Sequence, residues 1–115
     1  MMKSILLLLL TTVLLITAPA ADAQQPTKIP RIGHLIATSP SASPARIEAF
    51  RQGLREIRYV EGKNIIIEYR FAELKPERIP VLAAELVRLK VDVIVTGAGG
   101  MTRAAKEATN TIPIV

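Results

Sequence analysis

Two short segments carry the groups best suited to holding a ligand. Residues 38–43 are rich in serine and include Ser39 and Ser41. In the second segment, residues 96–102, the candidate ligand-binding residues are Thr96, Gly97, Ala98, Gly99, Met101 and Thr102. Neither segment contains a His, Asp, Glu, Lys or Arg that could act as an acid or a base. Their hydroxyls and backbone N–H groups suit a carboxylate or another anion, so they predict binding rather than catalysis.

The glycine cluster at residues 97–100 admits three interpretations. A dinucleotide fingerprint requires the spacing G-x-G-x-x-G after the first strand of the fold. Here Thr102 stands where the third glycine should be, and the cluster follows the third expected strand. The glycines otherwise form either a tight strand-to-helix turn or a loop that faces a ligand, and the residues leave that choice open.

The composition excludes several classes of site. The 115 residues include no Cys and one His, so there is no thiolate nucleophile, disulfide or multi-His metal site, and we expect no cofactor. Two Phe, two Tyr and no Trp are too few for a platform that stacks nucleic-acid bases. The net charge of +5 is scattered along the chain, so no nucleic-acid partner is expected. His34, inside the first expected strand, is interpreted as a structural residue.

The elements that position the two segments alternate between strands and helices. Short apolar and β-branched runs predict strands over residues 31–37, 64–72 and 91–95, with a fourth starting over 112–115. Helices are expected over residues 44–57, from 76 or 80 to about 90, and over 101–108. This alternation predicts an α/β fold with a doubly wound parallel sheet and right-handed crossovers.

Two details of these elements can be tested in the structure. Ser43 is expected to cap the first helix, whose apolar stripe is Ile47, Phe50, Leu54 and Ile57. The second strand alternates, with Ile65, Ile67, Tyr69 and Phe71 on one side, which places it at an edge of the sheet.

The first 23 residues have the features of a secretory signal. Lys3 precedes an apolar run over residues 5–18, which is shorter than the roughly 20 residues that span a bilayer. Ala21-Asp22-Ala23 provides a small-x-small cleavage pattern. We expect a signal peptide over residues 1–23 cleaved after Ala23, a linker over 24–30, and a periplasmic location. An uncleaved N-terminal anchor is the alternative.

The sequence ends inside the fourth expected strand, which leaves an apolar strand uncovered. We therefore interpret residues 31–115 as the N-terminal portion of a longer protein, or as the product of a truncated gene. A small domain that is completed by dimerisation is the alternative.

Five short motifs occur in a specific order: FRQGLRE at 50–56, YVEGKNI at 59–65, LAAELV at 82–87, VDVIV at 91–95 and TIPIV at 111–115. This succession resembles the substrate-binding proteins of ABC transporters, in the branch linked with tryptophan- and tyrosine-type amino acids. The resemblance implies a type I periplasmic-binding-protein fold, whose two lobes close on a small ligand and deliver it to a permease in the inner membrane.

The resemblance also implies where the ligand binds. By position, Ser39, Ser41 and residues 97–102 would face the cleft between the lobes, with an amino acid as the expected ligand. Residues 31–115 would be part of the N-terminal lobe, and this chain alone is expected to bind little or nothing, because the second lobe supplies the remaining contacts. The family usually has glycine where Arg58 stands, at a left-handed helix end. An exported α/β enzyme and a ligand-sensing module, each using the glycine-rich loop, are the alternative functions.

Overall fold

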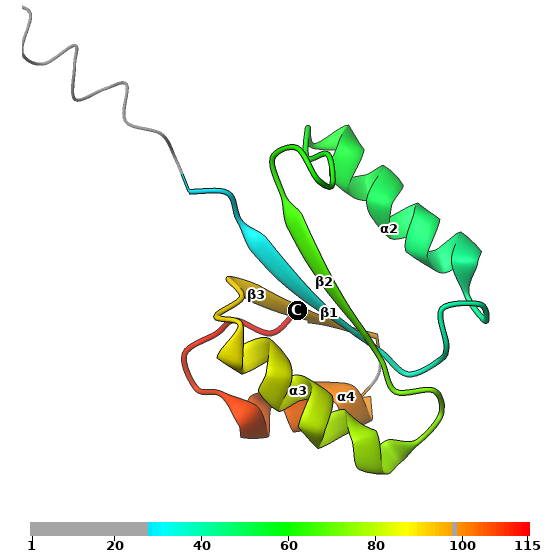
Figure 1. Cartoon of the computed structure of the whole chain (residues 1–115), viewed down its shortest axis with the longest axis vertical. Helices are drawn as coiled ribbons and strands as arrows, with labels where there is room; N and C mark the ends of the chain where they lie inside the picture. Colours follow the sequence, from blue (N-terminus) through cyan, green and yellow to red (C-terminus); the bar gives the residue numbers. More distant parts are fainter. Residues whose placement is uncertain (1–27, 98) are drawn as a thin grey trace, which may run out of the picture.

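The three strands in the described part of the chain form one parallel sheet (Figure 1). The computed structural model describes residues 28–97 and 99–115. In sheet order the strands are β2 (Ile66–Phe71), β1 (Arg31–Ile36) and β3 (Val93–Thr96). Ile32 of the central strand is in register with Ile67 on one side and Val93 on the other. The predicted parallel sheet is confirmed, with β2 at an edge.

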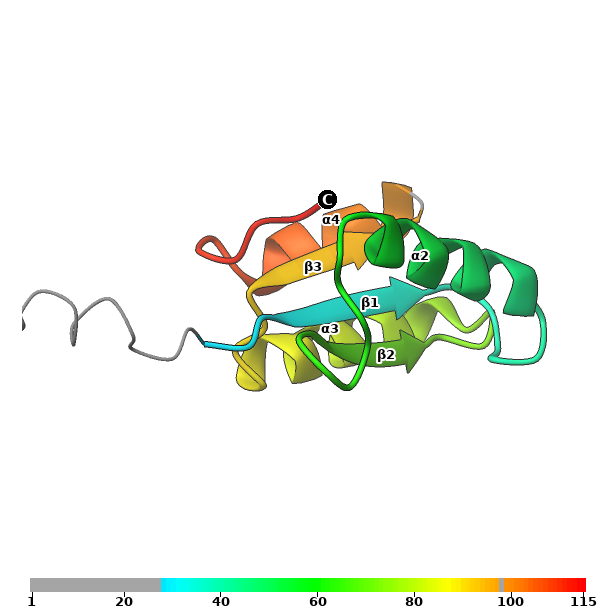
Figure 2. The same ribbon diagram turned by 90° about the horizontal axis from the view of Figure 1, so that it is seen from above.

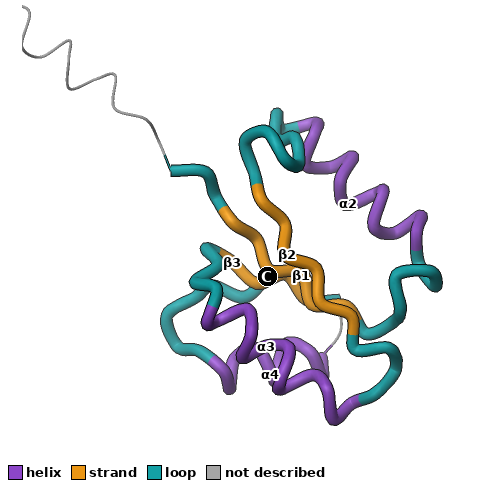
Figure 3. Tube along the Cα trace, viewed as in Figure 1, coloured by secondary structure: helices purple, strands orange, loops and turns teal. Residues whose placement is uncertain are grey.

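Helices cover both faces of this sheet (Figure 2). They are α2 (Pro44–Glu56), α3 (Ile79–Arg88), which follows the 3-10 helix η1 (Pro76–Arg78), and α4 (Gly99–Ala108). α2 lies on one face, and α3 and α4 lie side by side on the other (Figure 3). The chain passes over one face from β1 to β2 and returns over the other to β3, which is the predicted doubly wound arrangement. Within the part of the chain that is described, no helix is both long enough and apolar enough to cross a membrane.

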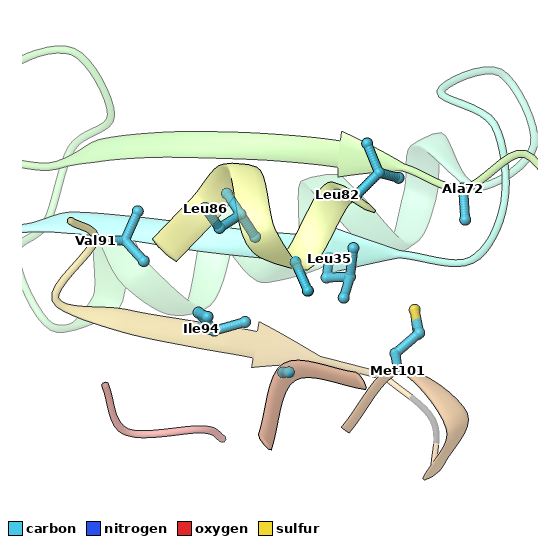
Figure 4. Packing of buried hydrophobic residues seen from close by; sticks show 9 residues of the cluster. Leu35, Ala72, Leu82, Leu86, Val91, Ile94 and Met101 are labelled. Atoms are coloured by element: carbon cyan, nitrogen blue, oxygen red, sulfur yellow. The ribbon is translucent and has the colours of Figure 1, made fainter. Parts of the chain in front are cut away.

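The main core lies between the sheet and the helices α3 and α4 (Figure 4). Leu35 of β1, Leu86 of α3 and Ile94 of β3 are fully buried there. A Cβ at Gly33 would lie 3.0 Å from both terminal methyl carbons of Leu86. Glycine therefore allows α3 to approach the central strand closely, which fixes the position of the elements that lead to the site.

α2 covers the opposite face through a smaller apolar contact. Ile47 is buried, and the ring of Phe50 lies 4.5 Å from the ring of His34 on β1. The predicted stripe is wrong at its last member, because Ile57 is 63 % exposed. The helix ends at Glu56, so Ile57 forms the C-cap and turns away from the sheet.

A residue in the left-handed region ends α2. Arg58 has a φ of 69°, and its N–H donates to the Arg55 carbonyl over 2.9 Å. The N–H of Tyr59 donates to the Leu54 carbonyl over 2.8 Å. These two bonds form a Schellman motif, which normally places glycine at the left-handed position. Arg58 thus takes the conformation that glycine would adopt at lower energy.

Some predicted boundaries are wrong by one or two residues. β3 begins at Val93 rather than at residue 91, because Asp92 belongs to a turn that is tied to Arg31. The Asp92 N–H donates to the Arg31 carbonyl over 2.7 Å, and its Oδ2 accepts the Arg31 N–H over 2.8 Å. β2 begins at Ile66 rather than at residue 64.

The ends of the helices also differ from the prediction. α4 begins at Gly99, two residues early, and Ser43 occupies the N-cap of α2 without a capping hydrogen bond from its side chain. In the C-terminal segment, Ile114 makes a single parallel bridge to Ile94 instead of a full strand. The predicted signal peptide, its cleavage site and most of the linker lie outside the described residues.

Candidate functional site

The carboxyl ends of the three parallel strands lie at one edge of the sheet (Figure 2). From β1 the chain moves outward to β2 and then returns past β1 to β3. The strand order therefore reverses between β1 and β3, and in open α/β sheets the crevice outside such a point is where ligands bind. The two segments selected from the sequence leave the sheet at this switch point.

A cavity of about 90 Å³ lies at this switch point. β1, α2 and the junction between β3 and α4 all contribute to its wall. The residues that line it are His34, Leu35, Ile36, Ser43, Arg46, Ile47, Gly97 and Met101. We call this cavity the switch-point pocket.

Two of the predicted site residues line this pocket, and two others hold the turn beside it. Gly97 and Met101 line it directly. The hydroxyls of Thr96 and Thr102 lie 2.6 Å apart in a hydrogen bond that ties the end of β3 to the first turns of α4. That bond fixes the turn that presents Gly97 to the pocket.

The other predicted residues, like Thr96 and Thr102, do not line the pocket. Ser39 and Ser41 lie in the loop after β1, where their hydroxyl oxygens are 3.3 Å apart. Gly99 is the exposed first residue of α4. Ala98 is outside the described residues.

Six lining residues were not among the candidates from the sequence: His34, Leu35, Ile36, Ser43, Arg46 and Ile47. The sequence analysis interprets His34 as structural, and Leu35 and Ile36 as part of the first strand. It assigns Arg46 and Ile47 only to the first helix, and Ser43, which lies in the candidate segment 38–43, only to the cap of that helix. The positions of the polar residues among them, relative to the strand and the helix at the switch point, could have identified them. His34 lies two residues before the end of the strand at the switch point, and Ser43 and Arg46 lie at the start of the helix that follows it.

The polar groups of the pocket favour a ligand with an anionic end. Arg46 is exposed and makes no ion pair with another described residue. Ser43 lies at the amino end of α2, where unpaired backbone N–H groups and the helix dipole favour negative charge. The Ser43 hydroxyl is 3.4 Å from that of Thr38, which holds the loop against the helix.

His34 lines this pocket as a group without a charge at neutral pH. Its side chain is partly buried, and the burial lowers the pKa of the imidazole from its ordinary value of 6.5. The ring packs between Phe50 and Tyr69, at centroid distances of 4.5 and 5.9 Å. His34 is therefore largely uncharged at neutral pH.

A separate cluster next to the pocket ties α2 to β2. Nε of Arg51 donates to Oε2 of Glu61 over 2.7 Å and to the Tyr69 hydroxyl over 3.1 Å. Burial and the nearby Glu61 carboxylate raise the pKa of Tyr69. Arg51 is engaged in this cluster, which leaves Arg46 as the cation that lines the switch-point pocket.

Within residues 28–97 and 99–115, no group of three or more His, Cys, Asp or Glu side chains is placed to hold a metal ion. The pocket combines apolar walls with one cation, one imidazole, one hydroxyl and a helix terminus. This equipment suits a small molecule that has an anionic end and a compact apolar part.

The fold is of the doubly wound α/β class, and the pocket lies at its switch point. The chain belongs to the family described as ABC transporter substrate binding protein, whose model matches residues 35–115. No curated protein matches the chain.

Solved structures share the fold. A conserved domain protein from Vibrio cholerae is 31 % identical, with a TM-score of 0.70 over 76 % of this chain. A ligand-free, open substrate-binding protein with adhesive properties from Clostridium difficile is 25 % identical, with a TM-score of 0.68 over 76 % of this chain. An ABC domain in complex with L-Trp from Streptococcus pneumoniae is 21 % identical over 76 % of this chain, with a TM-score of 0.67.

The chain spans only part of each of these proteins. It covers 30 % of the chains from Vibrio cholerae and Clostridium difficile and 29 % of the chain from Streptococcus pneumoniae. The likeness therefore concerns one part of a larger binding protein.

Proposed function

We propose that this chain forms part of the substrate-binding component of an ABC importer and that it captures an amino acid outside the inner membrane. The family match supports a substrate-binding role. The observation that carries the proposal is the switch-point pocket, where the β3–α4 junction meets β1 and the start of α2. An L-Trp complex among the similar structures supports an amino acid as the ligand.

The pocket suggests how an amino acid would be held. Its carboxylate would lie near Arg46 and the amino end of α2, and its side chain would enter the apolar part between Ile47 and Met101. Gly97 lets the ligand approach the backbone closely. Thr96 and Thr102 would act by holding the turn between β3 and α4. Ser39 and Ser41 lie in a loop that a second lobe could contact when the cleft closes.

The location and the partner are parts of the same proposal. Substrate-binding proteins of ABC transporters typically work outside the cytoplasm, and residues 1–23 have the features of a cleaved signal. The importer's permease would receive the ligand. Mass spectrometry of the exported protein should give a first residue of Gln24, and a mass that retains Met1 would contradict the proposed cleavage.

Ligand binding is tested by saturation-transfer difference NMR of the full chain with each of the twenty L-amino acids, since this method detects weak binding. Gly97→Asp places a carboxylate at the pocket and should abolish the signal. Gly53→Asp adds the same charge at an exposed helix position that does not line the pocket and whose Cβ would meet open space, so it should keep the signal. An absent signal for every amino acid in the unmodified chain would refute capture of an amino acid by this part of the protein.

A further inference from the structure

The outer edge of β2 is not paired with another strand of the described chain. The N–H groups of Ile66 and Ala72 donate to carbonyls on the β1 side of the sheet, so the even-numbered residues of β2 point their backbone groups at β1. Since these groups alternate along a strand, those of Ile67, Tyr69 and Phe71 point outward. Figure 2 shows no helix or strand of the described residues beyond this edge.

The open part of the edge runs over residues 67–71. Before it, the Gly62 N–H donates to the Ile65 carbonyl over 3.0 Å, so a turn of the chain itself occupies the edge there. Within it, Nη1 of Arg70 donates to the Tyr69 carbonyl over 2.8 Å. Apart from this side-chain bond, the outward backbone groups of the stretch have no partner among the described residues. Such an edge is a template for a strand from another chain.

The charges of β2 make this stretch complementary to a second copy of itself. Many edge strands carry charged side chains that discourage pairing, but the two charged residues of β2, Glu68 and Arg70, have opposite signs. They lie on either side of Tyr69, so an antiparallel copy centred on Tyr69 places its Arg70 opposite Glu68. Centring the pair on Glu68 or on Arg70 would instead place like charges opposite each other, which is destabilising. The charges therefore select the register centred on Tyr69.

The backbone of β2 fits the same register. In an antiparallel pair, two opposite residues exchange both hydrogen bonds where each points its backbone groups at the other strand. Centring on Tyr69 places Tyr69 opposite its copy and Ile67 opposite Phe71 of the copy, and all three point outward. The N–H of the second Tyr69 would replace Arg70 at the Tyr69 carbonyl. The Arg70 guanidinium would then be free to reach Glu68 of the copy.

The side chains on the α2 side of this edge add apolar surface to the contact. The rings of Tyr69 and Phe71 are half-buried and stack with their centroids 6.3 Å apart. They line an open groove together with Pro44 and Ile47 of α2. A second copy in the register centred on Tyr69 brings its own Tyr69 and Phe71 to the same side of the sheet, which removes ring surface from water.

We propose that two copies of this chain associate through their β2 strands, antiparallel and centred on Tyr69, so that one sheet continues across both copies. A two-fold axis would relate the copies, as in most homodimers. The carboxyl ends of the two sheets would point in opposite directions, and no residue of β2 lines the switch-point pocket. The contact is therefore independent of which ligand the pocket binds.

Hydrogen exchange of the exported protein tests the contact without any substitution. As the protein concentration rises, sedimentation velocity should show a monomer converting to a dimer. Over the same range the exchange of the Ile67, Tyr69 and Phe71 amides should slow by about tenfold or more. The amides of Glu68 and Arg70 already face β1 and should change much less. A protein that stays monomeric at every concentration would overturn the proposal, and so would a dimer that leaves the three outward amides unprotected.

Charge substitutions test the register. Glu68→Arg alone and Arg70→Glu alone each place like charges opposite each other, so each variant should dimerise about tenfold more weakly than the unmodified chain. Mixing the two variants places opposite charges together again, so the mixture should form a heterodimer about as tightly as the unmodified chain dimerises. Glu107→Arg, at an exposed position of α4, is the matched control and should leave dimerisation unchanged.

Circular dichroism shows whether each variant is folded. If both folded variants dimerise as tightly as the unmodified chain, or if their mixture forms no heterodimer, the register centred on Tyr69 is wrong and the proposal fails. If either variant does not fold, the exchange of the outward amides in the unmodified chain decides the proposal by itself.

Discussion

Replacing Arg58 by glycine should stabilise the protein. A non-glycine residue in the left-handed region costs about 1–2 kcal/mol, and Arg58 has a φ of 69°. Its side chain is exposed and makes no hydrogen bond or ion pair with the described residues. The bond from Asn64 Nδ2 to the Arg58 carbonyl, at 2.8 Å, involves only the backbone of Arg58 and is kept in the variant.

The expected gain in the free energy of unfolding is smaller than the full strain energy at Arg58. Glycine also increases the conformational entropy of the unfolded chain, which lowers the free energy of unfolding by about 0.5–1 kcal/mol. Arg58→Gly should therefore raise the free energy of unfolding by about 0.5–1 kcal/mol. For a domain of this size the gain corresponds to about 2–8 °C in Tm.

The assay is urea unfolding followed by circular dichroism. Arg58→Ala is the matched control, because it removes the same charge and side chain but keeps a Cβ in the left-handed region. Arg58→Gly should have a higher midpoint than Arg58→Ala at an unchanged slope. Equal midpoints for the two variants would refute the strain at the end of α2.

Three further predictions concern the core, a second left-handed turn and the histidine. Gly33→Val should lower the free energy of unfolding by about 1–3 kcal/mol, because the new side chain meets the fully buried Leu86; an unchanged urea midpoint would show that α3 can move away. Leu74→Gly should raise the urea midpoint, because Leu74 has a φ of 60° and is 78 % exposed; a lower midpoint would show that its side chain makes a stabilising contact. The pKa of His34, measured by NMR, should lie below 6.5 because of burial. The unfolded state then binds more protons, so the stability supplied by neutral His34 is present above pH 6.5 and is lost as the pH falls below it; a measured pKa at or above 6.5 would contradict this.

The alternation of strands and helices could be predicted because it depends on local patterns. The apolar run around β1 and the helical spacing of Leu82 and Leu86 are properties of neighbouring residues. The predicted start of β3 is wrong because the true start depends on a hydrogen bond between residues far apart in the sequence. Asp92 is held in a turn by Arg31, which lies 61 positions earlier in the chain.

The site could be predicted in part for a similar reason. Gly97 and Met101 were identified because loops at the carboxyl ends of parallel strands meet at the switch point. His34 and Arg46 were missed, since their place in the pocket depends on how α2 packs against β1. Ile57 continues the apolar spacing of α2, but its exposure follows from where the helix ends.

The central claim is that the switch-point pocket binds the ligand, and the methyl signal of Met101 tests it most directly. Met101 is the only methionine among the described residues, and its methyl carbon lies 3.7 Å from where a Cβ of Gly97 would be. In the full chain with ¹³C-methyl methionine and ¹⁵N backbone labels, the L-amino acid that gives the strongest saturation-transfer signal should shift the Met101 methyl and the Gly97 amide together. Saturable shifts confined to residues away from the pocket, such as Val81 on the exposed side of α3, with neither Met101 nor Gly97 affected, would contradict the claim.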